Sequence, residues 1–362
     1  MMIERPLVIS LLLVVLLLML AFLNQYSALH GWNAAFVHGM IKNSIALGIF
    51  FSAFLINEHL LERTIPLGYI GAVVLLLIVH LAGLTVKGAT RWIQLGYLTM
   101  QPAELAKIFT PLMAAHTVYF LRNHSSIIVF LAVFMVNFIP GILILKQPDL
   151  GSAILMATAG FFPILLSKIP LRFFALVSIV VCAMLPFAWH KLHHYQQERI
   201  LTLLHPERDP LGQGYHVQQS KIAIGSGGLF GKGFMSNTQA DYDFLPEHDT
   251  DFAFALFAEE WGFIGCSIVI ILFFLLIVQF IRLIFKVKSY YTQLLMFSLI
   301  APIFTYVFIN IGMISGILPV VGVPLPFFSR GGTHLLTTML SLGLFYSLYL
   351  HDKNNFRRYS RS

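Results

Sequence analysis

Carboxylates are the groups in this chain best suited to taking a proton from a hydroxyl. Ten of the 16 acidic residues fall between positions 190 and 260, and nearly everything outside that window is apolar: Glu198, Glu207, Asp209, Asp241, Asp243, Glu247, Asp249, Asp251, Glu259 and Glu260. A reaction that needs a carboxylate therefore has few other places to occur.

Asp251 gives the sharpest signal within this window. In FLPEHDTDFAFALFAEE the composition switches from polar to apolar at Thr250 and Asp251, which predicts that Asp251 lies in the first turn of a helix. A carboxylate there can simply cap the helix, because the positive end of the helix dipole favours it. The neighbouring Glu247 and Asp249 favour a functional role instead, since structure seldom requires three crowded carboxylates. We predict Asp251 as the catalytic residue.

A second charged motif, GATRWIQLGYLTMQPAELAK, opens another apolar helix. Pro102 marks the helix start, and Glu104 and Lys107 are one turn apart on one face. Charges inside a membrane are costly and usually functional, although a structural ion pair is the alternative. Arg91 and Trp92, just before the helix, are either substrate contacts or interface anchors.

Three further stretches carry polar residues that could contact a substrate. In KQPDLGSA, Asp149 is best read as a helix cap. IGSGGLFGKG, which contains Lys232, fits neither a Walker loop nor a dinucleotide fingerprint. It is either an outer loop whose amides approach an anion or a sugar, or a set of turn glycines.

The third stretch, GILPVVGVPLPFFSRGGTH, is irregular at membrane depth, which requires that it is packed in protein or lines a cavity. Arg330 there faces an anionic group or anchors the interface. The complete set of candidate substrate-binding residues is Arg91, Trp92, Lys232, Gln239, Glu247, Ser329 and Arg330. No metal ligands are assigned, because His190, His193 and His194 lack a carboxylate or cysteine at ligand spacing.

The elements that must position these residues are membrane helices. The chain has 362 residues, 58% of them hydrophobic and 11% charged, with a mean hydropathy of +0.81, which excludes a water-soluble globule. The fold class is an all-α polytopic bundle of about ten helices. The predicted spans are Pro6–Leu23, Met40–Ile56, Leu67–Val86, Glu104–Leu121, Ile127–Leu145, Gly151–Ser167, Leu171–Trp189, Asp251–Ile281, Tyr291–Met313 and Thr333–Leu350.

Lys and Arg in the short loops predict the orientation, with both termini cytoplasmic and residues 190–250 forming one long extracytoplasmic loop. Within that loop, GYHVQQSKIAIG is expected to form a short helix. The chain is read as a single membrane domain over 1–362. The basic residues lie at span ends without a patch for nucleic acid, and Cys182 and Cys266 are expected as small buried side chains.

Together these motifs resemble the SEDS family of polytopic peptidoglycan glycosyltransferases. The resemblance rests on RWIQLG, QPAELAK, KQPDLGSA, DPLGQGYHVQQSKIAIGSGGLFGKG, FLPEHDTDFAFALFAEEWGFIG and ILPVVGVPLPFFSRGG, in family order over nearly the whole chain. QPDLG and LPVVGVPLPFF look more like the elongation and rod-shape members than the division member FtsW. The family's essential aspartate falls on Asp251, its Glu and Lys on Glu104 and Lys107, and its RW pair on Arg91 and Trp92.

The resemblance implies ten helices and polymerisation of lipid II, the undecaprenyl-diphosphate-linked disaccharide pentapeptide, at the periplasmic face of the bacterial inner membrane. It also implies a class B penicillin-binding protein as transpeptidase partner, in an elongation complex with MreC and MreD. Two departures concern its loops: the family usually has Tyr at Arg330 and Ser-Ser at Thr333 and His334, and HDTDF adds Asp249 in place of the usual histidine.

Sugar transfer from a diphosphate needs one base, because the diphosphate leaves readily. We expect Asp251 to be that base, with Glu104 and Lys107 supporting it and cationic groups or a divalent cation, Mg²⁺ or Mn²⁺, offsetting the charge. The alternatives are a flippase for the lipid-linked precursor and a non-catalytic scaffold. A flippase would carry charge along a path through the bilayer, whereas these ionisable residues gather at span ends.

Overall fold

The computed structural model describes residues 5–86, 89–95, 98–167, 169–191, 197–198, 201–203, 213–236, 249–330 and 332–359. Apolar runs form helices because a helix satisfies its own backbone hydrogen bonds where water is excluded. The helices in these ranges are α1 Arg5–Ala28, α2 Ala34–Ala53, α3 Glu58–Ala82, α4 Pro102–Phe120, α5 Ser126–Lys146, α6 Leu150–Leu165, α7 Leu171–Lys191, α9 Gln213–Ser226, α11 Ala253–Ile284, α12 Tyr290–Ile314 and α13 Gly332–Tyr359.

Several helices begin at a polar residue that caps them. The side chains of Asn33, Asn57, Asp149 and Ser289 accept hydrogen bonds from backbone amides three residues on, at the starts of α2, α3, α6 and α12. Asp149 is therefore a helix cap, as predicted. In α4 the cap position gives no side-chain bond, and Pro102 occupies the first turn.

Each of the ten predicted spans falls on a helix of the described chain, but some boundaries differ. The span predicted from Leu67 begins earlier, because Asn57 caps α3 and Pro66 lies inside it. The helix predicted from Asp251 begins at Ala253 and is broken at Gly262, whose φ is 64° and ψ is −164°. The short helix predicted in GYHVQQSKIAIG is α9.

A small antiparallel sheet between α3 and α4 was not predicted. Its strands are β1 Leu84–Val86, β2 Ala89–Leu95 and β3 Leu98–Met100, in the order β1-β2-β3. Trp92 pairs with Leu84, and Ile93 pairs with Met100. The sheet connects α3 to the start of α4 and so fixes the approach to Glu104.

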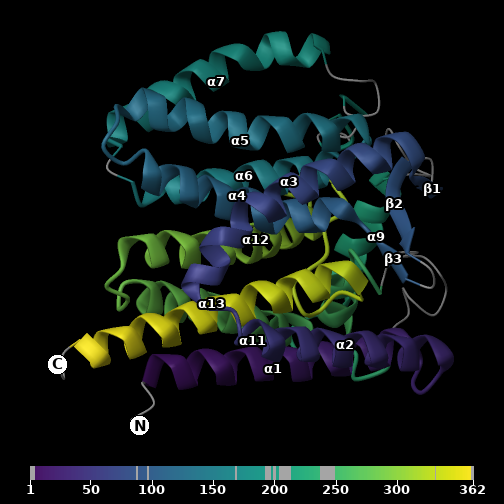
Figure 1. The fold of residues 1–362 in the computed structure, drawn as a ribbon. Helices are drawn as coiled ribbons and strands as arrows, with labels where there is room; N and C mark the ends of the chain where they lie inside the picture. The colour runs from purple at the N-terminus through teal and green to yellow at the C-terminus, as the bar shows by residue number, and fades with distance from the viewer. Residues whose placement is uncertain are drawn as a thin grey trace.

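Helix α12 lies at the centre of the bundle, in contact with α4, α6, α11 and α13. Around it α1 packs on α11, α2 on α13, and α3 on α4, while α7 lies at the outer edge beside α5 (Figure 1). Both termini lie at one end of the bundle, and the sheet and α9 lie at the other end (Figure 1).

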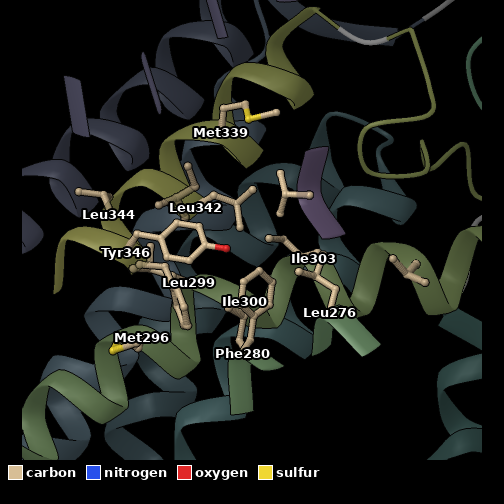
Figure 2. Close-up of a cluster of buried hydrophobic side chains, with 14 of the residues drawn as sticks. Leu276, Phe280, Met296, Leu299, Ile300, Ile303, Met339, Leu342, Leu344 and Tyr346 are labelled. Atoms are coloured by element: carbon tan, nitrogen blue, oxygen red, sulfur yellow. The ribbon is translucent and has the colours of Figure 1, made fainter. Parts of the chain in front are cut away.

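The apolar core is continuous across α11, α12 and α13 (Figure 2). Phe280, Leu299 and Leu342 interdigitate there, and the hydroxyl of the buried Tyr346 donates to Ser10 of α1 at 3.0 Å. Four helices therefore share one core, which holds α12 in a fixed position.

The protein is a polytopic helical membrane protein. Within the described ranges, six helices are long and apolar enough to cross a bilayer: α1, α2, α3, α5, α11 and α12. Large apolar side chains such as Leu12, at 57% exposure, and Leu81, at 84%, face outward, where lipid can cover them. Both cysteines are free, and the prediction that they are buried is wrong: Cys182 is exposed and Cys266 is partly buried. The number of spans and their orientation stay predictions.

Candidate functional site

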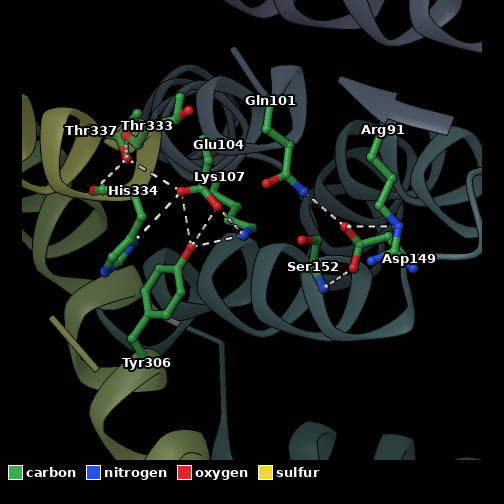
Figure 3. A network of polar contacts seen from close by, with 10 residues as sticks. All are labelled: Arg91, Gln101, Glu104, Lys107, Asp149, Ser152, Tyr306, Thr333, His334 and Thr337. Carbon is green, nitrogen blue, oxygen red and sulfur yellow. Dashed lines mark hydrogen bonds and ion pairs between the residues drawn. The ribbon is translucent and has the colours of Figure 1, made fainter. Parts of the chain in front are cut away.

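Glu104 and Lys107 form a buried ion pair with Tyr306 of the central helix (Figure 3). The Lys107 ammonium donates to Glu104 Oε1 at 2.6 Å and to the Tyr306 hydroxyl at 2.8 Å. That hydroxyl lies 3.1 and 3.0 Å from the two Glu104 oxygens, so it donates to the carboxylate in turn. Each of the two charged residues is only 4% exposed.

Helix α13 adds two residues to the same carboxylate. The Thr337 hydroxyl lies 3.3 Å from Glu104 Oε2, and His334 Nδ1 lies 3.7 Å from the same oxygen. The His334 ring packs on Tyr306 with centroids 4.3 Å apart (Figure 3). We call Glu104, Lys107, Tyr306, His334 and Thr337 the buried cluster.

The buried cluster joins α4, α12 and α13 through polar contacts in the interior of the bundle. A buried ion pair is tolerated only when its geometry is good and further hydrogen bonds satisfy the remaining lone pairs, which Tyr306 and Thr337 do here. The predicted pairing of Glu104 with Lys107 is confirmed. Its tertiary partners show that the pair faces the protein interior and not lipid.

Asp251 lies in the turn that precedes α11 and is partly buried. Because Phe252 occupies the cap position of α11, Asp251 is one residue outside the helix, and its predicted place in the first turn is wrong. The carboxylate lies against Gly322: a Cβ built on that glycine would be 3.2 Å from Asp251 Oδ2. Gly322 has a φ of +67°, a conformation that side chains disfavour.

The central helix connects Asp251 to the buried cluster. The Asn310 side-chain amide donates to the Asp251 carbonyl at 2.8 Å and to the Val323 carbonyl at 2.6 Å. Asn310 is one helical turn after Tyr306, a rise of about 6 Å. Asp251 and the Glu104–Lys107 pair are thus held by successive turns of α12.

Arg91 holds the turn between α5 and α6. Its guanidinium donates to the carbonyls of Gln147, at 3.2 Å, and Pro148, and it lies 3.9 Å from the Asp149 carboxylate. Gln101 donates to the same carboxylate at 3.0 Å (Figure 3). Arg91 therefore stabilises the turn between α5 and α6. Trp92, the next residue, is partly buried in β2.

Arg330 pairs with Asp249. Its guanidinium lies 2.9 Å from Asp249 Oδ2, and its amide donates to the Asp249 carbonyl at 2.8 Å. Arg330 and Asp249, two of the positions where the chain departs from the family pattern, therefore contact each other. They line a cavity of about 200 Å³ together with Gln25, Gly39, Lys42, Asn43, Thr250 and Gly332.

The remaining candidate residues lie at separate places. Ser329 is buried, and its hydroxyl accepts from the Leu325 amide at 2.8 Å within its own turn. The Lys232 ammonium lies 2.6 Å from the buried carboxylate of Glu259 in α11. Gln239 and Glu247 lie outside the described residues.

The glycine-rich loop packs on α11 through its backbone. The amides of Gly231, Lys232 and Gly233 donate to the carbonyls of Gly227, Glu259 and Glu260, at 2.8 to 3.1 Å. A Cβ on Gly231 would collide with the backbone at Glu260, and one on Gly262 would collide with the backbone of Gly231 and Leu229. These glycines permit a close contact between two segments, and the three amides are not directed at an anion.

Tyr306, Asn310, His334 and Thr337 had not been identified as site residues from the sequence. The available signal was the spacing of Tyr306 and Asn310, two polar residues four positions apart in an apolar helix. Across the described ranges, no group of three or more His, Cys, Asp or Glu side chains is placed to hold a metal ion.

The fold and the site define a polytopic membrane protein with a charged cluster in its interior and a carboxylate at one end of the bundle. A family model described as cell cycle protein, FtsW/RodA/SpoVE, matches residues 2–354. The chain belongs to this family, the SEDS family.

The chain is similar to curated and solved members. The peptidoglycan glycosyltransferase MrdB of Escherichia coli K12 is 42% identical over 351 residues, covering 93% of both chains. The Helicobacter pylori MrdB (strain 26695) is 34% identical over 84% of this chain and 80% of its own length. A solved chain of a peptidoglycan synthase complex matches 96% of this chain and 98% of its own, with a TM-score of 0.82 and 27% identity. Thermus thermophilus RodA matches 94% and 95%, with a TM-score of 0.71 and 25% identity.

Proposed function

We propose that this protein is a peptidoglycan glycosyltransferase that polymerises glycan strands during cell elongation. The observation that carries the proposal is the 42% identity to a curated peptidoglycan glycosyltransferase over 93% of both chains. The substrate is lipid II, and the reaction takes place at the outer face of the cytoplasmic membrane.

The chemistry requires one base. An acceptor sugar hydroxyl attacks the anomeric carbon of the donor, the bond from that carbon to the diphosphate oxygen breaks, and the hydroxyl proton passes to the base. Glycoside hydrolysis uses a second carboxylic acid to protonate its leaving group, whereas a diphosphate leaves as a stable anion without one.

Asp251 is that base in our proposal. Its position supports the role, because the partly buried carboxylate lies in the turn before α11 and not at the cap position of the helix. The turn that carries it also contributes Asp249 and Thr250 to the cavity of about 200 Å³, so open space adjoins this turn. Gly322 leaves the room that the carboxylate occupies.

Glu104 and Lys107 act as positioning residues in this proposal. They are buried and bonded to Tyr306, so they fix α12, and α12 holds the Asp251 carbonyl through Asn310. A displacement of the carboxylate by about 1 Å is enough to lower a rate by a factor on the order of 100. The pair therefore supports catalysis without touching the substrate.

The test is glycan polymerisation from purified lipid II by the Asp251→Asn protein. We expect a folded protein that makes no polymer. Asp352→Asn is the matched control, because Asp352 lies at the opposite end, where it accepts from the Lys288 and Ser289 amides, and we expect that variant to polymerise normally. Polymer of normal length and rate from Asp251→Asn would refute the assignment. Lipid flipping in vesicles that the Asp251→Asn protein largely retains would favour a flippase.

The partner in our proposal is a class B penicillin-binding protein, which supplies the crosslinking step, in an assembly with MreC and MreD. Support comes from the similarity to a chain of a complex described as coordinating polymerisation and crosslinking. Co-purification from membranes checks the partner: we expect a transpeptidase to accompany the tagged chain, and its consistent absence contradicts the proposal.

A divalent cation, Mg²⁺ or Mn²⁺, would offset charge on the diphosphate. The described residues offer no cluster of three ligands for it, so no step above depends on the ion. Chelation with EDTA tests the requirement: we expect the polymerisation rate to fall and to return when Mg²⁺ or Mn²⁺ is added.

A further inference from the structure

A cavity of about 480 Å³ lies between the ends of α4 and α6 and the starts of α5 and α12. Its polar rim includes Arg122, His124 and Ser126, and its apolar walls include Val118, Val129 and Ile169. The Tyr290 hydroxyl closes one side by donating to the Leu166 carbonyl at 3.0 Å. The cavity therefore combines cationic groups with an apolar wall.

The cavity is remote from the proposed catalytic site. Tyr290 begins α12, and Asn310, which contacts Asp251, is 20 positions further along the helix. That separation is about 30 Å along the helix axis. The cavity thus lies toward the end of the bundle that carries the termini (Figure 1).

Arg122 is held in an orientation suited to an anion. Its guanidinium lies 4.2 Å over the Tyr119 ring, and NH1 donates to the Tyr119 carbonyl at 2.9 Å. This bond uses one of five N–H donors, and the side chain remains exposed. None of the described residues that line the cavity is acidic. A fixed guanidinium with a neighbouring histidine and serine suits phosphate oxygens.

The surroundings favour a lipid over a soluble anion. Ile127 and Leu165, which adjoin the lining residues Ser126 and Leu166 in the chain, are 60% and 58% exposed, as expected of side chains that face acyl chains. The cavity therefore lies where the polar rim meets the lipid-facing surface. A ligand that suits both parts carries a negative headgroup and an apolar tail.

We propose that this cavity binds an anionic phospholipid from the leaflet on the side of the termini. Its headgroup phosphate pairs with Arg122, and His124 and Ser126 supply further hydrogen bonds. One acyl chain lies along Leu166 and Ile169, the partly exposed apolar residues of the lining. The site serves lipid recognition, and it does not depend on the proposed glycosyltransferase reaction.

The experiment measures lipid retention by native mass spectrometry of the full-length protein, with phosphatidylglycerol and phosphatidylcholine supplied in equal amounts. We expect at least about tenfold preference for phosphatidylglycerol, equivalent to one charge-assisted hydrogen bond. Arg122→Ala should lose the preference, and Arg122→Lys should keep part of it, because the charge remains without the planar fork.

Arg63→Ala is the matched control. Arg63 is an exposed residue of α3. The start of α3 lies at the same end of the bundle as the cavity, because Glu58 accepts a hydrogen bond from Ser289, the residue before Tyr290, at 3.4 Å. Arg63 itself does not line the cavity. We expect its lipid preference to stay within twofold of the unaltered protein. Equal loss in both variants, or no preference in the unaltered protein, would overturn the proposal.

Competition separates a lipid from a free anion without any variant. Inorganic phosphate at the same concentration as the lipid should not displace phosphatidylglycerol from the unaltered protein. Complete displacement would show a phosphate site and overturn the lipid assignment. This arm also decides the question if Arg122→Ala fails to fold.

Discussion

Replacing Lys107 by methionine removes the ammonium but keeps a side chain of similar length. Glu104 is then left as a charge that is only 4% exposed, with the Tyr306 hydroxyl 3.0 Å and the Thr337 hydroxyl 3.3 Å away as its nearest donors. Breaking a buried ion pair from one side costs about 3–5 kcal/mol. Because two hydroxyl partners remain, we expect a loss near the lower limit, about 3 kcal/mol of unfolding free energy.

The assay is unfolding in mixed micelles, measured for Lys107→Met, Glu104→Gln and the double variant. We expect the double variant to be more stable than the sum of the two single losses predicts, with a coupling energy of about 1–3 kcal/mol. Lys146→Met is the control, because Lys146 is exposed at the end of α5, and its cost should stay within about 0.5 kcal/mol.

Two results would contradict this reasoning. If Lys107→Met unfolds like the unaltered protein, the pair does not hold α4 against α12. If the two single losses simply add, the coupling energy is zero, and Glu104 and Lys107 contribute to stability independently of each other.

Three further predictions concern the region around Asp251. Gly322→Val should abolish polymerisation, because the valine side chain would collide with the Asp251 carboxylate. A φ of +67° also costs a branched residue about 1–2 kcal/mol of stability. Polymerisation and unfolding of the variant are both measured. Asn310→Leu should lower the polymerisation rate at least about tenfold, since it releases the Asp251 carbonyl. Arg330→Asp should impair activity, and the exchange Asp249→Arg with Arg330→Asp should restore it in part, measured on the same substrate.

Controls separate local strain from damage to the site. Gly228 has a φ of +56°, and a Cβ there would meet nothing within 4 Å, so Gly228→Ala should cost similar backbone strain and leave polymerisation unchanged. Equal inactivation by Gly228→Ala and Gly322→Val would show that backbone strain alone, and no contact with the carboxylate, explains the loss. An exchange variant as inactive as Arg330→Asp alone would show that the ion pair has no positioning role.

The helices were predictable from the sequence because each follows from a local apolar run. The pairing of Glu104 with Lys107 and the capping by Asp149 were predictable for the same reason, since both involve residues three apart. The three short strands were missed because strands of three to seven residues carry little periodic signal.

The partners of Glu104 could not be predicted in this way. Tyr306 is 202 positions away in the chain and Thr337 is 233, so their contacts depend on how α4, α12 and α13 pack. The same holds for Arg330 and Asp249, which looked like two unrelated departures until the fold placed them 2.9 Å apart. The positions of Gln239 and Glu247, outside the described residues, stay untested.

The facing glycines at positions 231 and 262 restrict how this protein can change over generations. An alanine at either position would place its methyl group against main-chain atoms of the opposite segment. Trimming a neighbouring side chain cannot make room for it, because every residue has the same main chain. A second substitution that only changes a side chain therefore cannot compensate for a substitution at either glycine. Compensation requires a changed backbone in both the loop and the break in α11.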